Sequence, residues 1–149
     1  IISSVKYTLS ANVENLVLAD AVTNATGVLV GATSGTGNAL DNVIVGNQLA
    51  NTLTGLAGND TLDGGLGAKG DTLIGGAGDD TYYINNALDK ITESAGLSNG
   101  VDIALAKVDI SGLSTNVENL TLLEVGANEE GSSLATYGVG NTLANVING

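Results

Sequence analysis

The residues best placed to do chemistry are aspartates that follow glycines at a fixed spacing. From Gly37 onward the sequence divides into five units: GNALDNVIV, GNQLANTLT, GLAGNDTLD, GGLGAKGDTLI and GGAGDDTYY. Once the two-residue insertion around Lys69 and Gly70 is absorbed, the sixth position holds Asn42, Asn51, Asp60, Asp71 and Asp80. The eighth position holds Ile44, Leu53, Leu62, Leu73 and Tyr82. Columns that keep their chemistry through successive units indicate a structural repeat.

Each unit combines a flexible turn, an acidic oxygen and a short apolar strand. Glycine permits a sharp turn with positive φ, and it lets backbone carbonyl oxygens approach an ion closely. The last three residues of a unit suit a strand whose middle side chain points inward. If two units make one coil, turns on the same edge stack about 4.8 Å apart. An oxygen-lined gap between such turns suits Ca²⁺, which takes about 6–8 oxygen ligands at roughly 2.3–2.6 Å.

The charge balance of the 149 residues narrows the possible partners. The chain has 16 acidic residues and four Lys, for a net charge of −12. Nucleic acids and anionic membranes attract Lys and Arg clusters, so neither is an expected partner. Stacked carboxylates oppose folding unless cations neutralise them. Because no stretch approaches the ~18 apolar residues of a membrane-spanning helix, no membrane span is expected.

Several residue types are missing altogether, and their absence limits the chemistry. Without Cys and His, Zn²⁺ and Cu are poor candidates for the metal, and no Ser-His-Asp or Cys-His arrangement can form. We therefore expect that the chain is not an enzyme by itself. Ca²⁺-dependent polysaccharide lyases share a β-helical architecture, but this lyase alternative would need a second chain to supply the basic residue.

The fold class expected from these patterns is all-β, a right-handed parallel β-roll or β-helix solenoid. The sequence contains no Pro, Phe, Trp or Met, and small and β-branched residues dominate, which suits thin stacked layers. Alternation of apolar and polar residues predicts short strands. The expected strands are Thr61–Asp63, Thr72–Ile74, Tyr82–Ile84, Lys90–Glu93 and Val101–Leu105.

A longer repeat frames the nonapeptides. Asn12–Leu16 returns as Asn116–Leu120, and Gly37–Ile44 returns as Gly140–Ile147. We therefore expect a single solenoid over 1–149, with flanking β-helical coils in 1–36 and a nonapeptide core in 37–83. Residues 84–149 would hold further flanking coils and the start of a second module copy. Gly149 falls where a new nonapeptide should begin, so the array is expected to continue in a parent protein.

The nonapeptides resemble the repeats-in-toxin (RTX) family, whose Ca²⁺-binding repeat reads G-G-x-G-x-D-x-U-x, with U a large apolar residue. Gly75–Tyr83 fits every fixed position of that pattern. Gly64–Gly67 followed by Asp71–Ile74 fits it around the insertion, and Gly55–Asp63 fits it except that Leu56 replaces the second glycine. The flanking segments YTLSANVENL and the returning VENL also resemble tandem modules of large bacterial RTX proteins.

The resemblance implies a ligand set of sixth-position carboxylates together with backbone oxygens at positions two and four. By this reading Asp60 and Asp80 share the strongest site on one edge. Asp71 lies on the opposite edge, where the neutral Asn51 makes a weaker site. The backbone ligands of the two edges would come from Gly58, Gly76, Gly78, Gly65 and Gly67.

Polar residues at other positions have assignments of their own. Units with Asn at position six, such as those of Asn42 and Asn145, would be metal-free coils stacked by Asn hydrogen bonds. Asn59 and Asp79 at position five are expected to face solvent, and the insertion at Lys69 to loop outward. Asp89, Glu93 and Asp102 follow the repeats, and either a further Ca²⁺ site or a solvated edge would explain them. Ordinary turn aspartates remain the simpler alternative to metal ligands.

The function implied by the resemblance is calcium-dependent folding of an extracellular repeat segment in a larger secreted or surface protein of a bacterium. Its partners would be calcium ions and neighbouring repeats of the parent. The alternative is an adhesin-like module that recognises surface glycans or ice through the outward Thr column. That column comprises Thr52, Thr61, Thr72 and Thr81.

Overall fold

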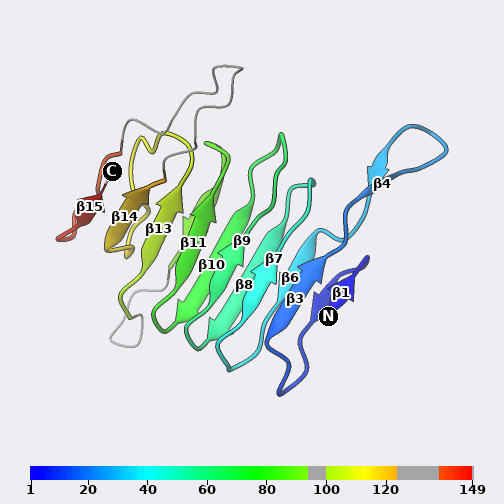
Figure 1. Ribbon diagram of the computed structural model, residues 1–149, viewed down its shortest axis with the longest axis horizontal. Helices are drawn as coiled ribbons and strands as arrows, with labels where there is room; N and C mark the ends of the chain where they lie inside the picture. The colour runs from blue at the N-terminus through cyan, green and yellow to red at the C-terminus, as the bar shows by residue number, and fades with distance from the viewer. Residues whose placement is uncertain (94–99, 124–137, 149) are drawn as a thin grey trace.

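The computed structural model describes residues 1–93, 100–123 and 138–148. Within these ranges the chain forms strands, turns and loops without a helix, so none of it is a helix that could cross a membrane. Figure 1 shows the strands side by side along the long axis. The strands are β1 (Ile2–Ser3), β2 (Tyr7–Thr8), β3 (Asn15–Leu18), β4 (Val22–Thr23), β5 (Leu29–Val30), β6 (Ser34–Thr36), β7 (Val43–Val45), β8 (Thr52–Ala57), β9 (Thr61–Asp63), β10 (Thr72–Ala77), β11 (Thr81–Ile84), β12 (Lys90–Thr92), β13 (Ile103–Ala106), β14 (Asn119–Leu122) and β15 (Val146–Asn148).

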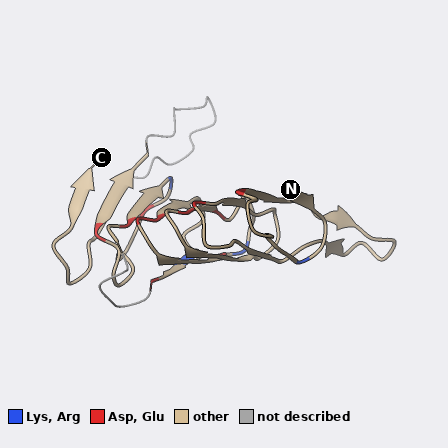
Figure 2. Ribbon diagram, turned by 90° about the horizontal axis from the view of Figure 1, so that it is seen from below, with Lys and Arg blue, Asp and Glu red and all other residues tan. Residues whose placement is uncertain are grey.

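Two parallel sheets face each other and form a flattened solenoid (Figures 1 and 2). One sheet has the order β1-β3-β7-β9-β11-β13-β14-β15, and the other has the order β12-β10-β8-β6-β2. Thr61 pairs with Val43 below it and with Thr81 above it, while Thr52 pairs with Thr72 in the other sheet. Two nonapeptides therefore make one coil, as the sequence predicts, and the all-β parallel solenoid is confirmed.

The core is a ladder of eighth-position side chains between the sheets. Ile44, Leu53, Leu62, Leu73 and Tyr82 are all 0% exposed. Burying a side chain of this size contributes about 1.5–3 kcal/mol. The flanking coils extend the same ladder with Leu16, Ala104 and Leu120.

Strand boundaries follow the sequence expectation closely, with one systematic difference. β9 spans the expected residues, whereas β8 and β10 continue past the first glycine of the following unit. Leu56 pairs with Gly76 and Ala57 with Ala77, so part of each turn on this edge still belongs to the sheet. A turn and a strand therefore overlap there.

The N-terminal flank contains a feature that the sequence did not predict. β4 and β5 pair antiparallel and form a hairpin that projects from one end of the solenoid (Figure 1). The longer repeat is visible in the backbone, because Asn12 and Asn116 both adopt positive φ, at 62° and 64°. The repeated segments therefore share a local turn, which an Asn tolerates better than most residues.

Leu56 occupies a conformation that favours glycine. Its φ is +92°, and it pairs with Gly76, which holds the same position in the next unit on this edge and has a φ of +122°. A non-glycine residue in such a region costs about 1–3 kcal/mol. The exposed Leu66 also lies in a turn, yet it is not among the residues with positive φ.

We expect Leu56→Gly to stabilise the calcium-loaded protein, by up to about 2 kcal/mol, because it removes this backbone strain. Leu66→Gly is the matched control, and it should be neutral or destabilising by about 0.5–1 kcal/mol, because glycine gains freedom in the unfolded chain. Chemical denaturation of both variants in excess calcium measures the difference. Equal effects of the two substitutions would contradict the strain at Leu56.

Candidate metal centre

The sixth-position side chains stack along two edges of the solenoid. The Asp60 edge comprises Asn42, Asp60, Asp80 and Asp102, and the Asp71 edge comprises Asn51, Asp71 and Asp89. On each edge the backbone N–H of one residue donates to the carboxylate of the next coil. The N–H of Asp60 donates to Asp80 Oδ1 at 2.7 Å, and the N–H of Asn51 donates to Asp71 Oδ1 at 2.7 Å. The predicted pairing of Asp60 with Asp80, and of Asp71 with Asn51, is therefore what the structure has.

Fifth-position side chains form a second ladder that runs the opposite way. The N–H of Asn59 donates to Asp41 Oδ1 in the preceding coil at 2.7 Å, and the N–H of Asp79 donates to Asn59 Oδ1 at 2.9 Å. Val101 continues it with a hydrogen bond to Asp79 Oδ1. Asn59 and Asp79 are exposed, as expected. The two ladders thus satisfy the consecutive N–H groups where the turn ends.

The second carboxylate oxygen of Asp60, Asp71 and Asp80 has no such partner. Within the described part of the chain, Oδ2 of Asp60, Asp71 and Asp80 is buried and accepts no hydrogen bond, and these residues are at most 1% exposed. Each Oδ2 lies against the opening glycine of its own unit, where a built Cβ would contact it. A buried charged oxygen without a partner is costly, so each of these carboxylates requires a proton or a cation.

The electrostatics of these carboxylates agree with their geometry. Burial is the main cause that raises the pKa of Asp60 to about 7, and repulsion from Asp80 adds to it. Burial likewise raises the pKa of Asp71 to about 6 and of Asp80 to about 6. The pKa of Asp102 rises to about 7, again mainly through burial, with repulsion from Asp80 and Glu118. The backbone hydrogen bonds lower each value but do not offset burial.

Units with Asn at position six fill the same space with an uncharged side chain whose polar atoms form hydrogen bonds. Asn42 Oδ1 accepts from the N–H of Asn38 at 2.7 Å, and Asn42 Nδ2 donates to Asn38 Oδ1 and to Val13 O. The same pattern joins Asn47 with Asn51 and Asn141 with Asn145. The predicted stacking of these coils by Asn hydrogen bonds is confirmed. The paired Asn at position two was missed, although the recurring G-N-x-x-x-N pattern was its sequence signal.

The expected backbone ligands fall into two groups. On the Asp60 edge the carbonyls of Leu56 and Gly58 face Gly76 and Gly78, where a side chain would collide with them. On the Asp71 edge two of the predicted oxygens already accept hydrogen bonds. Gly67 O accepts from Asn86 Nδ2, and Asn51 Oδ1 accepts from the N–H of Asn47.

The insertion within the Asp71 edge also has the expected exposure. Ala68 and Lys69 are both exposed, as an outward loop requires. Which of the predicted oxygens ligate an ion on either edge stays a prediction, as does the greater strength of the Asp60–Asp80 site.

Comparison with known proteins supports the reading of the repeats. The family model for the RTX calcium-binding nonapeptide repeat matches residues 36–68 and 67–83, in four copies. This part of the chain belongs to the RTX calcium-binding repeat family. The Asp60, Asp71 and Asp80 carboxylates fit calcium, because each of these three units buries an anionic oxygen that accepts no hydrogen bond within the described chain.

Two proteins of Rhizobium meliloti (strain 1021) are similar over part of their length. The endo-1,3-1,4-beta-glycanase ExsH is 36% identical over 98 residues, which is 66% of this chain and 18% of ExsH. The endo-1,3-1,4-beta-glycanase EglC is 36% identical over 99 residues, which is 65% of this chain and 18% of EglC. The chain therefore spans less than a fifth of either relative. No solved structure matches it.

The raised pKa values predict how the calcium-free RTX fold responds to pH. A carboxyl group whose pKa is higher in the fold than the ordinary value of 3.8 stabilises the fold below that value, and this contribution is lost as pH rises through about 6 to 7. In chelator-treated buffer, melting temperature should therefore rise when pH is lowered from about 8 to about 5. Thermal unfolding by circular dichroism measures it. A calcium-free fold that is more stable at the higher pH would contradict the assignment.

The Asp60→Asn substitution tests whether Asp60 is a metal ligand or has a structural role alone. The amide keeps Oδ1 for the N–H of Asn42 and removes the buried charge. We expect calcium affinity to fall about tenfold or more, while the calcium-free form becomes more stable by about 1–3 kcal/mol. Calorimetry and denaturation measure the two effects.

Asp79→Asn is the matched control for this experiment, because Asp79 is adjacent in the stack, exposed and also a hydrogen-bond acceptor through Oδ1. It should change neither quantity appreciably. If Asp60→Asn instead weakens the fold equally with and without calcium, Asp60 has a structural role alone.

Proposed function

We propose that calcium drives the folding of this chain, and that the chain is a non-enzymatic repeat segment of a larger secreted bacterial protein. The observation that supports this proposal most directly is the set of buried Oδ2 atoms at Asp60, Asp71 and Asp80. Without a cation they must be protonated or leave the interior. A cation between the coils removes that penalty, so binding and folding are one process.

The negative charge of the chain would make folding depend on calcium. At a net charge of −12, the unfolded chain keeps its carboxylates apart, whereas the solenoid stacks them on shared edges. In a compartment with little free calcium the unfolded form is favoured, which suits export. Extracellular modules bind calcium at roughly 10⁻⁴–10⁻³ M, so folding would follow secretion.

The parent protein is proposed to carry an activity elsewhere in its chain. Both glycanases match over less than a fifth of their own lengths, so the shared part is a segment within longer proteins. A sequence without His, Cys or Arg offers few groups for acid-base or nucleophilic catalysis. We therefore propose that a glycan-directed activity, if the parent has one, lies outside this segment.

Circular dichroism in the presence of EGTA tests this function. At neutral pH the spectrum should show a largely disordered chain with a residual β signal from a marginally stable calcium-free fold, and millimolar calcium should convert it to a full β spectrum. Magnesium at the same concentration should be much less effective, because it requires near-octahedral geometry at about 2.0–2.1 Å and loses its waters reluctantly. Identical spectra with and without calcium would contradict the proposal.

A second candidate function, surface recognition, is favoured by the outer face of the β12-β10-β8-β6-β2 sheet. The predicted Thr column is divided between the two sheets, because Thr61 and Thr81 lie on the other one. The register nevertheless aligns further hydroxyls in this sheet. One row holds Ser34, Thr52 and Thr72, and another holds Thr8, Thr36 and Thr54, followed by Ile74 and then Thr92. Regular hydroxyl rows offer a repeating surface to an ordered glycan.

Retention on insoluble mixed-linkage β-glucan tests this second function. The folded protein should be retained, and Thr54→Lys should release it by disrupting the centre of the hydroxyl rows. Thr81→Lys places the same charge on the other sheet and should leave retention unchanged. Failure of the unmodified protein to bind would exclude this function.

A further inference from the structure

The column of first-position glycines on the Asp60 edge ends in a glutamate. Ile74 pairs with Thr92, so the residue that follows Gly75 in the stack is Glu93. The preceding coils have Gly37 and Gly55 at this position. In those coils the missing Cβ leaves room for the position-six side chain. At Glu93 the same column carries a side chain that ends in a carboxylate.

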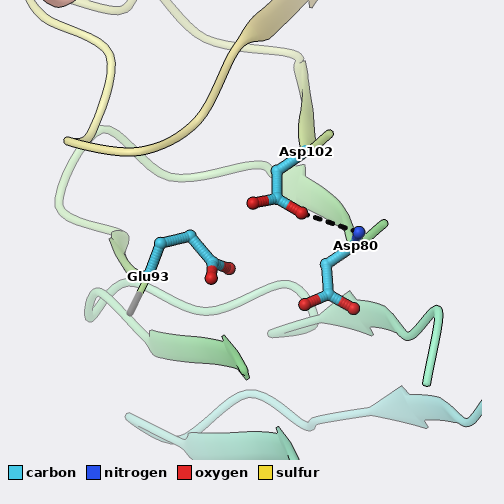
Figure 3. A group of neighbouring side chains, drawn as sticks. All are labelled: Asp80, Glu93 and Asp102. Carbon is cyan, nitrogen blue, oxygen red and sulfur yellow. Dashed lines mark hydrogen bonds between the residues drawn. The ribbon is translucent and has the colours of Figure 1, made fainter. Parts of the chain in front are cut away.

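Glu93 meets two buried aspartates. Carboxylate oxygens of Asp80, Glu93 and Asp102 all lie within 4.8 Å of one another (Figure 3). Asp80 and Asp102 are 0% exposed, and the N–H of Asp80 donates to Asp102 Oδ1 at 2.8 Å. We refer to these three side chains as the terminal carboxylate cluster. Three acidic groups held this close repel one another strongly in a site that excludes water.

The Tyr82 hydroxyl is an independent indication that a ligand belongs here. Tyr82 is 0% exposed, and its hydroxyl has no hydrogen-bond partner within the described residues. A Cβ built on Gly75 would contact three atoms together: the Tyr82 hydroxyl, Asp80 Oδ2 and Glu93 Oε1. A buried tyrosine hydroxyl normally has a partner. Here it points at the same place as two carboxylate oxygens, one of which, Asp80 Oδ2, likewise accepts no hydrogen bond.

We propose that the terminal carboxylate cluster, with the Tyr82 hydroxyl, is a dedicated calcium site that closes the repeat array. Oxygens no more than 4.8 Å apart share a point within about 2.8 Å of each, close to the roughly 2.3–2.6 Å of calcium ligation. All of the ligand atoms are oxygens, which favours Ca²⁺ over Zn²⁺, because Zn²⁺ prefers nitrogen and sulfur ligands. The site differs from the turn sites of the repeats in joining three carboxylates, one of them from the first-position column.

The site has a consequence for the order of calcium binding. Affinity of calcium sites rises with the number of charged ligands, and this cluster brings three carboxylates to one ion. It therefore fills before the repeat turns and fixes the last coil, against which Asp80 and then Asp60 stack. This inference rests on the proposed function in one respect, which is that calcium is the ion available to the chain.

Glu93→Gln in the full chain tests the site, with Glu14→Gln as the matched control. Glu14 is exposed and lies in the N-terminal flank, so it undergoes the same loss of charge away from the cluster. Calcium titration by calorimetry should show one tight site fewer, or that site weakened at least about tenfold, in Glu93→Gln only. Terbium luminescence excited through tyrosine should also fall in Glu93→Gln, and in Tyr82→Phe, because Tyr82 is the tyrosine whose hydroxyl faces the ion.

The outcomes separate this site from calcium-driven folding. An unchanged number of ions and unchanged affinity in Glu93→Gln, compared with Glu14→Gln, would overturn the site. If the unmodified protein folds without calcium yet Glu93→Gln loses a tight ion, the proposed function fails and the site stands. If Glu93→Gln does not fold, Glu93→Gly replaces it, because the preceding coils carry glycine in this column. The same loss of one ion is then expected.

Discussion

The whole fold depends on how the position-six side chain connects one coil to the next. One oxygen of each aspartate accepts the backbone N–H of the neighbouring coil, which fixes the stacking distance. That hydrogen bond holds the carboxylate inside the turn, and its second oxygen is left buried against the opening glycine. The interaction that joins the coils therefore creates the electrostatic penalty that a proton or a cation must relieve.

The chain solves this packing problem in two ways. Asparagine units use the amide group for the same backbone contacts and satisfy both side-chain atoms with hydrogen bonds, as Asn42 does with Asn38. Aspartate units keep the N–H contact but retain a charge. Under the proposed function, asparagine coils stack without an ion, whereas aspartate coils stack only when calcium is bound. Because the aspartate units Asp60, Asp71 and Asp80 are consecutive and the asparagine units lie to either side of them, this proposed calcium requirement is confined to a part of the chain.

The repeat period made most of the fold predictable from the sequence. Because residues at position eight recur with the period, the buried ladder from Ile44 to Tyr82 was predictable, and so was the stacking of Asp60 on Asp80. The terminal carboxylate cluster was not, because the nonapeptide period ends at Tyr83 and only strand pairing places Glu93 above Gly75. The β4–β5 hairpin also has no periodic signature, since it depends on local backbone geometry.

Backbone hydrogen exchange, measured with and without calcium at neutral pH, tests most directly whether position-six carboxylates make stacking conditional on calcium. The amides of Asn42 and Asp60 donate to aspartate carboxylates, whereas those of Asn38 and Asn47 donate to asparagine oxygens. On calcium removal the first pair should lose protection and the second pair should retain more of it. Amides of Asn42 and Asp60 that stay fully protected without calcium would contradict the account.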